Sequence, residues 1–138
     1  MIVVLATKQI VPRAIAVSVE RMRRHVLDLS IAHAIQVSWC VRPSKAYAVK
    51  ESREICIAPI RSAISYATAL HEIGHVCGQH QASPHSLIRE AAAWRWARAN
   101  ALTWNYGMEK LAGEAIGFAK AAVTELARLA QTHNPTPS

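Results

Sequence analysis

The segment His71-Glu72-Ile73-Gly74-His75 has the form HExxH, whose residue types and spacing suit zinc chemistry. Two histidines four residues apart lie one turn apart on the same face of a helix, so both imidazoles can bind one metal ion. Glu72 points about 100° around the helix from His71. From there it can accept a proton from an attacking water without being a ligand. The motif therefore predicts a zinc site with Glu72 as the catalytic base.

A catalytic zinc site needs a third protein ligand and leaves one position open for water. The chain after the motif offers five candidates: His80, His85, Glu90, Glu109 and Glu114. The pattern HxxGxxH would continue the motif, but position 81 is Gln. His80 is one residue out of register with that pattern, and Gly78 is interpreted as the end of the helix that carries the motif.

Glu90 is the favoured third ligand. It falls in a helix expected to begin at Ser83-Pro84, where Ser is a good N-cap and Pro suits the first turn. Its face is otherwise apolar and carries Leu87, Trp94, Ala97 and Ala101. A carboxylate on such a face needs a partner, because burying it alone is costly. A metal ion would be that partner, with a salt bridge to Arg98 as the alternative and His85 as the second choice of ligand.

These two segments resemble the ImmA/IrrE-type family of small zinc peptidases, which is itself similar to the wider gluzincins. The resemblance lies in residues 69–75, ALHEIGH, with Gly78 and His80 behind them, and in residues 90–97, EAAAWRWA. It covers residues 53–104 and implies that Glu90 is the third ligand, with Ala93 as the small residue three positions later. The sequence departs from the family's pattern in the short gap from His75 to Glu90 and in residues 101–104, ALTW, where the family's second helix often closes with Leu-Met-Pro. The pattern is similar to compact phage- or prophage-encoded members.

The composition fits one folded domain. The chain has 138 residues, 51% hydrophobic and 18% charged, which is typical of a single domain and excludes wholesale disorder. We expect one zincin-like domain over residues 1–132 and a flexible tail over 133–138. The apolar run of residues 1–6 is too short for a signal peptide or a membrane span. Three cysteines without a CxxC pair indicate reduced thiols in a cytoplasmic protein. No membrane partner is expected.

The charge balance leaves a second class of function open. Sixteen Lys and Arg residues against nine Asp and Glu give a net charge of +7, and Arg21, Arg23 and Arg24 form a small cluster. Nucleic-acid binding is possible on that basis but is not favoured, because no helix-turn-helix, zinc-finger or aromatic-basic motif accompanies the charge. A solvated helix face is the favoured interpretation. A zinc-containing regulatory protein without peptidase activity is the other alternative, and the sequence leaves the oligomeric state open.

Hydrophobic periodicity predicts the elements that must position these residues. An apolar stripe predicts a helix that starts near Pro12 and runs to about Leu29, and alternation predicts strands near residues 35–41, 47–49 and 55–57. Helices are then expected over residues 62–78, 83–104 and 108–130. The last contains Gly113 and Gly117, interpreted as a close-packing face against a neighbouring helix.

The predicted fold class is α+β and zincin-like, with an N-terminal helix, a three-stranded antiparallel meander, the HExxH helix and two further helices. The strand near residues 54–58 is expected to be the edge that binds an extended peptide or protein substrate, unless residues 1–5 cover it. Tyr66, Tyr106 and His85 are candidates for stabilising the oxyanion. The predicted activity is hydrolysis of peptide bonds with Zn²⁺ as cofactor.

Overall fold

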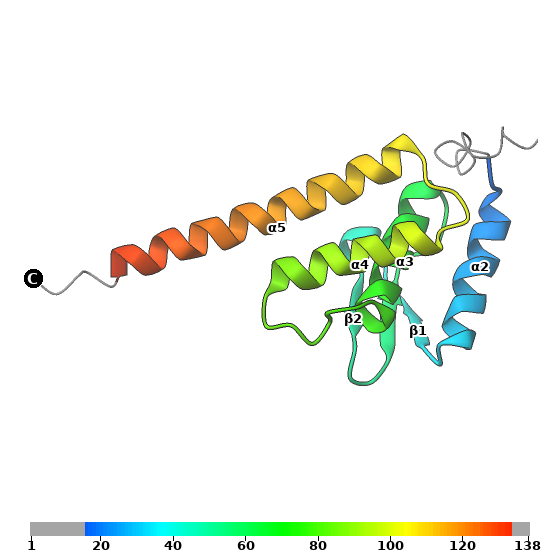
Figure 1. The fold of residues 1–138 in the computed structure, drawn as a ribbon. Coiled ribbons are helices and arrows are strands. Elements are labelled where there is room, and N and C mark those ends of the chain that lie inside the picture. Colours follow the sequence, from blue (N-terminus) through cyan, green and yellow to red (C-terminus); the bar gives the residue numbers. More distant parts are fainter. Residues whose placement is uncertain (1–15, 134–138) are drawn as a thin grey trace, which may run out of the picture.

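The computed structural model describes residues 16–133, which form four α-helices and a small three-stranded sheet, an α+β arrangement (Figure 1). The elements follow in the order α2 (Val19–Ala32), β1 (Gln36–Trp39), the short 3₁₀ helix η3 (Pro43–Lys45), β2 (Tyr47–Val49), β3 (Glu54–Ile57), α3 (Ala63–Cys77), α4 (Ser86–Asn100) and α5 (Tyr106–His133).

The sheet is mixed, so the predicted antiparallel meander is wrong. Its strand order is β1-β3-β2, with β1 parallel to β3 and β2 antiparallel to β3. Only β2 and β3 are joined by a tight turn, in which Arg53 has a φ of 53°. The longer connection through η3 carries the chain from β1 to the far side of β3. Period-two alternation identifies strands but does not specify their neighbours.

Because β3 is the central strand, the predicted edge at residues 54–58 is also wrong. Ile55, Cys56 and Ile57 are all buried, so both faces of this central strand are covered. Among the described residues, β2 and β1 are the edge strands. The segment 1–5, considered as a cover for the edge, lies outside the described residues.

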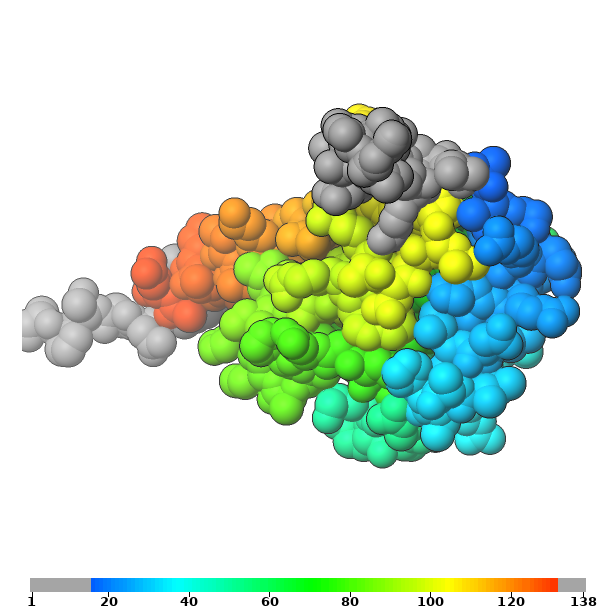
Figure 2. Space-filling model, turned by 45° about the vertical axis from the view of Figure 1, so that its right-hand side comes forward, coloured from blue at the N-terminus to red at the C-terminus, as the bar shows by residue number. Residues whose placement is uncertain are grey.

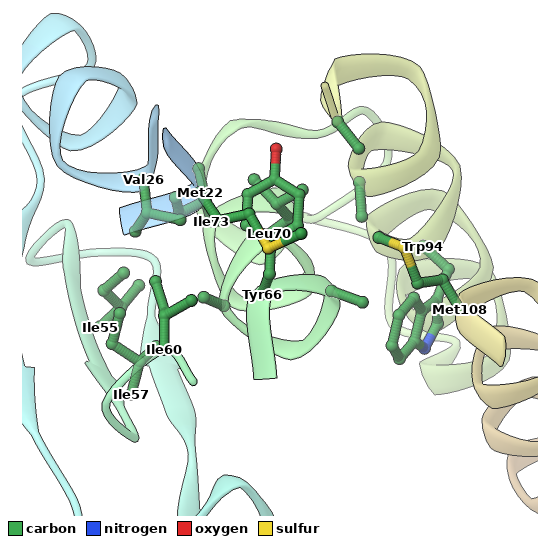
Figure 3. Packing of buried hydrophobic residues seen from close by; sticks show 14 of the residues in the cluster. Met22, Val26, Ile55, Ile57, Ile60, Tyr66, Leu70, Ile73, Trp94 and Met108 are labelled. Atoms are coloured by element: carbon green, nitrogen blue, oxygen red, sulfur yellow. The ribbon is translucent and has the colours of Figure 1, made fainter. Parts of the chain in front are cut away.

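Helix α3 is the centre of the fold. It begins after Ser62, whose side chain forms a capping box with Ser65, and ends at Gly78, as the sequence predicted. Three of its buried side chains, Tyr66, Leu70 and Ile73, lie between two groups of apolar residues. Figure 3 shows these groups: on one side Met22, Val26, Ile55 and Ile60, and on the other Trp94 and Met108.

Close packing of α3 against α4 depends on Gly74, the fourth residue of the HExxH segment. A Cβ atom built on Gly74 would lie 2.5 Å from the backbone oxygen of Ala93. Only a residue without a side chain lets the two backbones approach this closely. The contact brings the helix that carries both histidines next to the helix that carries Glu90.

We therefore expect Gly74→Ala to destabilise the protein by about 1–3 kcal/mol, because the added methyl group must push the α4 backbone away. Gly113→Ala is the matched control, since no described atom lies within 4 Å of its Cβ position in α5. There the gain in helix propensity should stabilise the protein by roughly 0.5–1 kcal/mol. Chemical denaturation of both variants measures the difference, and equal shifts in the unfolding free energy would contradict the packing argument.

The helix boundaries differ from the predictions where local signals compete. Ser83-Pro84 forms a turn rather than the start of α4, because the Ser83 hydroxyl accepts a hydrogen bond from the His85 amide and the helix begins one residue later. The helix also ends at Asn100, four residues before its predicted end at residue 104. Helix α2 starts at Val19 with Ser18 as its N-cap. The predicted start near Pro12 lies outside the described residues.

The second half of α5 extends beyond the packed body (Figures 1 and 2). Residues 120–131 are all exposed. Gly113 and Gly117 face open space among the described residues, so the predicted close packing of this pair is wrong. Of the predicted tail, only His133 is described, as the last residue of α5. None of the described helices is long and apolar enough to span a membrane.

Candidate metal centre

The structure brings together the three residues predicted as metal ligands. One ligand atom from each of His71, His75 and Glu90 lies within 4.8 Å of the others. The Nε2 atom of His71 is 3.0 Å from Oε1 of Glu90, and Nε2 of His75 is 2.8 Å from Oε2 of the same carboxylate. Each carboxylate oxygen thus faces one imidazole.

Two helices hold this group in place. His71 and His75 lie one turn apart on α3, with ring centroids 4.5 Å apart and nearly edge to face. Glu90 lies on α4, on the side that faces α3. The His71 ring stacks on the buried Trp94 ring, with centroids 4.2 Å apart and planes 15° from parallel. Trp94 belongs to the apolar face on which Glu90 was predicted to lie, so that face both packs the core and orients a histidine.

The His75 ring is held at its other nitrogen by Gln81, a residue that the sequence analysis did not assign to the site. Nδ1 of His75 is 2.9 Å from Oε1 of Gln81, which is buried. The only signal in the sequence is negative, because position 81 is where the HxxGxxH pattern expects a third histidine. In this fold the residue at that position contacts a histidine through its far nitrogen instead.

Glu72 lies beside the three converging residues but is not one of them. It is buried, and its Oε2 atom is 3.3 Å from Nδ1 of His71. It contacts the His71 nitrogen that does not face Glu90. It lines the same pocket as His71, His75 and Glu90.

The charges in this group are strongly coupled. Burial by itself lowers the pKa of His71, but hydrogen bonds and charge interactions with Glu72 and Glu90 outweigh it and raise the pKa to about 9. Burial likewise raises the pKa of the Glu90 carboxyl, yet the hydrogen bonds from His71 and His75 hold it well below its usual range. The site therefore favours a positive charge next to Glu90, and a metal ion binding there must displace the proton on His71.

The donor set suits zinc. Two imidazole nitrogens and one carboxylate oxygen are a combination that zinc uses in catalytic sites, where it also keeps a position for water. The three residues open onto a pocket of about 500 Å³, so a fourth position is accessible from solvent. His71, His75 and Glu90 therefore fit a catalytic zinc ion by their chemistry and by their access.

The pocket lies against the edge strand β2. Its wall includes Ala46 just before β2, Tyr47 and Ala48 from β2 itself, and Lys50 and Glu51 from the following turn. The opposite side is formed by residues of α3 and α4 and by the loop that joins them. The rim of the cleft is thus β2 rather than the predicted strand at residues 54–58.

The other candidate ligands do not join the converging group. They are placed as follows: His80 and His85 are exposed in the loop before α4, Glu114 is exposed on α5, and Glu109 binds Arg98 and Trp104. The alternative partner of Glu90, Arg98, contacts Glu109 on α5 instead. The observed positions therefore favour Glu90 over every alternative that the sequence left open.

Neither tyrosine considered for oxyanion stabilisation lines the pocket. Tyr66 is fully buried, and its hydroxyl contacts His25 and accepts a hydrogen bond from the Leu102 amide. Tyr106 is 82% exposed at the start of α5. Tyr47 on β2 does line the pocket, and it was not identified from the sequence.

The arginine cluster of α2 does not form a uniform basic surface. Arg23 donates a hydrogen bond to the Ile60 carbonyl oxygen and lies 3.7 Å from Glu20. A shallow pocket on this helix is lined by Arg21 and Arg24 together with Glu20 and Asp28. The mixed charge fits a solvated helix face better than a phosphate-binding one.

A comparison with models of known protein families finds no match, and comparisons with curated proteins and with solved structures find none either.

Proposed function

We propose that the protein is a zinc-dependent metallopeptidase of the ImmA/IrrE type with a zincin-like fold. One observation carries the proposal: His71, His75 and Glu90 converge at the floor of an open pocket that a buried carboxylate, Glu72, also lines. The resemblance of the two motif segments to that family supports the same activity. It also favours a regulatory protease of phage or prophage origin.

The residues divide the reaction between them. When bound by His71, His75 and Glu90, zinc would polarise the scissile carbonyl and lower the pKa of water. The Glu72 carboxylate accepts one proton from the attacking water, whose oxygen forms the new bond to the carbonyl carbon. As the carbon–nitrogen bond breaks, Glu72 returns that proton to the leaving nitrogen. The products are a new carboxyl terminus and a new amino terminus.

The substrate proposed for this site is an extended peptide that pairs with β2. This strand is hydrogen-bonded to β3 on one side, and no other described strand covers its second side. Its first residues line the pocket that contains the catalytic groups. A peptide added as a further strand would gain main-chain hydrogen bonds and lie across the floor of the cleft.

Amide hydrogen exchange tests this placement. A peptide bound to the zinc-loaded Glu72→Gln protein should slow exchange in Tyr47–Val49, because strand addition engages backbone groups on the open side of β2. The free edge of β1, Gln36–Trp39, is the internal control and should not change. Protection confined to β1 or to the arginine-rich α2 would contradict the placement.

A cytoplasmic setting is part of the proposal. Cys40, Cys56 and Cys77 are all free thiols in the structure, which suits a reducing compartment.

The proposed function is tested by metal analysis together with mass-spectrometric identification of cleaved peptides, wild type against Glu72→Gln. Zinc bound by both proteins, with cleavage by the wild type alone, is the expected result. Binding without cleavage by the wild type would favour a regulatory zinc protein instead.

A further inference from the structure

The side-chain amide of Gln81 has its orientation fixed by two backbone carbonyls. Its Nε2 atom donates to the carbonyl oxygen of Gln79 at 3.1 Å and to that of Arg89 at 2.9 Å. The reversed orientation would set the amide oxygen against two other oxygens, with no proton between them. Oε1 of Gln81 must therefore face His75.

This orientation requires a proton on Nδ1 of His75. An amide oxygen can only accept, so Nδ1 of His75 must donate across the 2.9 Å contact. Nε2 is then the nitrogen whose lone pair a metal ion can take, once the proton that Nε2 shares with Glu90 is displaced. Nε2 is the atom that lies 2.8 Å from Glu90, among the converging ligand atoms.

The same side chain also ties the two ligand-bearing helices together. Gln81 lies in the loop between α3 and α4, and its bond to the Arg89 carbonyl reaches the residue directly before Glu90. It thus contacts the second histidine on one side and the backbone next to the third ligand on the other. Gln81 is 8% exposed, so water cannot readily replace these bonds.

We propose that Gln81 is a positioning residue of the metal centre, which holds His75 with its proton on Nδ1 and its Nε2 lone pair directed at a zinc ion. The inference rests on the metal site of the proposed function, although not on peptidase activity. Partners of this kind fix the tautomer and orientation of a metal-binding histidine, and their loss typically lowers metal affinity about 10–100-fold.

Three variants distinguish this role from a purely structural one, in which Gln81 only stabilises the loop between α3 and α4 through its bonds to the two carbonyls. Gln81→Met keeps the length of the side chain but removes every hydrogen bond. Gln81→Glu keeps an acceptor for Nδ1 of His75, but it loses the bonds donated to the two carbonyls and sets its second oxygen against them. Gln79→Met is the matched control, because Gln79 is an exposed residue of the same loop.

Zinc affinity is measured for each variant by competition with a chromophoric chelator at one fixed pH. We expect Gln81→Met to bind zinc about 10–100-fold more weakly than the wild type, with Gln81→Glu recovering part of the loss and Gln79→Met unchanged. A purely structural role predicts that Gln81→Glu binds zinc as weakly as Gln81→Met, since both variants lose the bonds donated to the two carbonyls. That result, or wild-type affinity in Gln81→Met, overturns the proposal. Circular dichroism of the metal-free variants checks that each is folded.

A second measurement does not depend on metal binding. Long-range ¹H–¹⁵N correlation spectra of the metal-free Glu90→Ala protein, in which no carboxylate competes for a proton on Nε2 of His75, should show the neutral His75 ring with its proton on Nδ1. A proton on Nε2 overturns the inference. If the wild type binds no zinc, the proposed function fails, while this spectrum still decides whether Gln81 sets the tautomer of His75.

Discussion

Replacing Glu72 by Gln is expected to leave zinc bound and the fold intact while lowering peptide hydrolysis about 10²–10⁴-fold, the usual contribution of a general base. The amide has nearly the same shape and can still form hydrogen bonds, but it cannot take a proton from the attacking water. Single-turnover kinetics on a cleaved peptide, with zinc content measured on the same samples, gives the size of the effect.

Glu51→Gln is the matched control for this change. Glu51 lines the same pocket from the turn after β2 and is exposed, so the loss of its charge should leave turnover within a few-fold of the wild type. Equal turnover by wild type and Glu72→Gln would exclude Glu72 as the base. An equal fall in both variants would assign the effect to the charge of the pocket rather than to proton transfer.

Replacing Glu90 by Ala is expected to abolish stoichiometric zinc binding. Its carboxylate faces Nε2 of both histidines, at 3.0 and 2.8 Å, so its removal takes away one ligand and the negative charge of the site. The loss of affinity should exceed the ~10–100-fold that is typical of an outer partner. Isothermal titration with zinc measures it, and His75→Ala should give a similar loss.

Two residues that the sequence also offered as ligands are the controls for this experiment. His80→Ala and Glu114→Ala should bind zinc as the wild type does, because both side chains are exposed and neither joins the converging group. Wild-type binding by Glu90→Ala, combined with a loss in either control, would mean that the third ligand is assigned incorrectly.

The parts of the site that could be predicted are those fixed by local helix geometry. The i, i+4 spacing of His71 and His75 sets their common face without reference to the rest of the chain. Glu90 could be identified because a carboxylate on an apolar helix face requires a partner, and the structure indeed places it at two imidazoles. In both cases the relevant property, which residues share one face of a helix, is set by a single helix.

The sheet could not be predicted to the same depth. Alternation located all three strands, but a strand's pattern does not state which neighbour it pairs with or in which direction. Because of this error, the sequence placed the rim of the cleft at β3, whereas the structure has it at β2. The unbroken apolar run Ile55-Cys56-Ile57-Ala58 was the sign available in the sequence that β3 is central, since an edge strand more often alternates.

Gln81 was missed for a different physical reason. Its role depends on hydrogen bonds to the carbonyls of Gln79 and Arg89, which exist only once the loop between α3 and α4 is folded. A neutral amide carries no charge or spacing signature that would mark it as part of a metal site. The packing role of Gly74 could not be predicted for a similar reason, because its close approach to Ala93 depends on how α3 and α4 pack together.

Hydrolysis in H₂¹⁸O tests the central claim most directly. The zinc-loaded protein is incubated with a proteome-derived peptide library, and new carboxyl termini are identified by mass spectrometry. The account predicts ¹⁸O-labelled termini with the wild type, their loss when zinc is chelated, their return when zinc is added, and their absence with Glu72→Gln. Cleavage that persists without zinc or with Glu72→Gln, or no cleavage by wild-type protein that holds stoichiometric zinc, would contradict it.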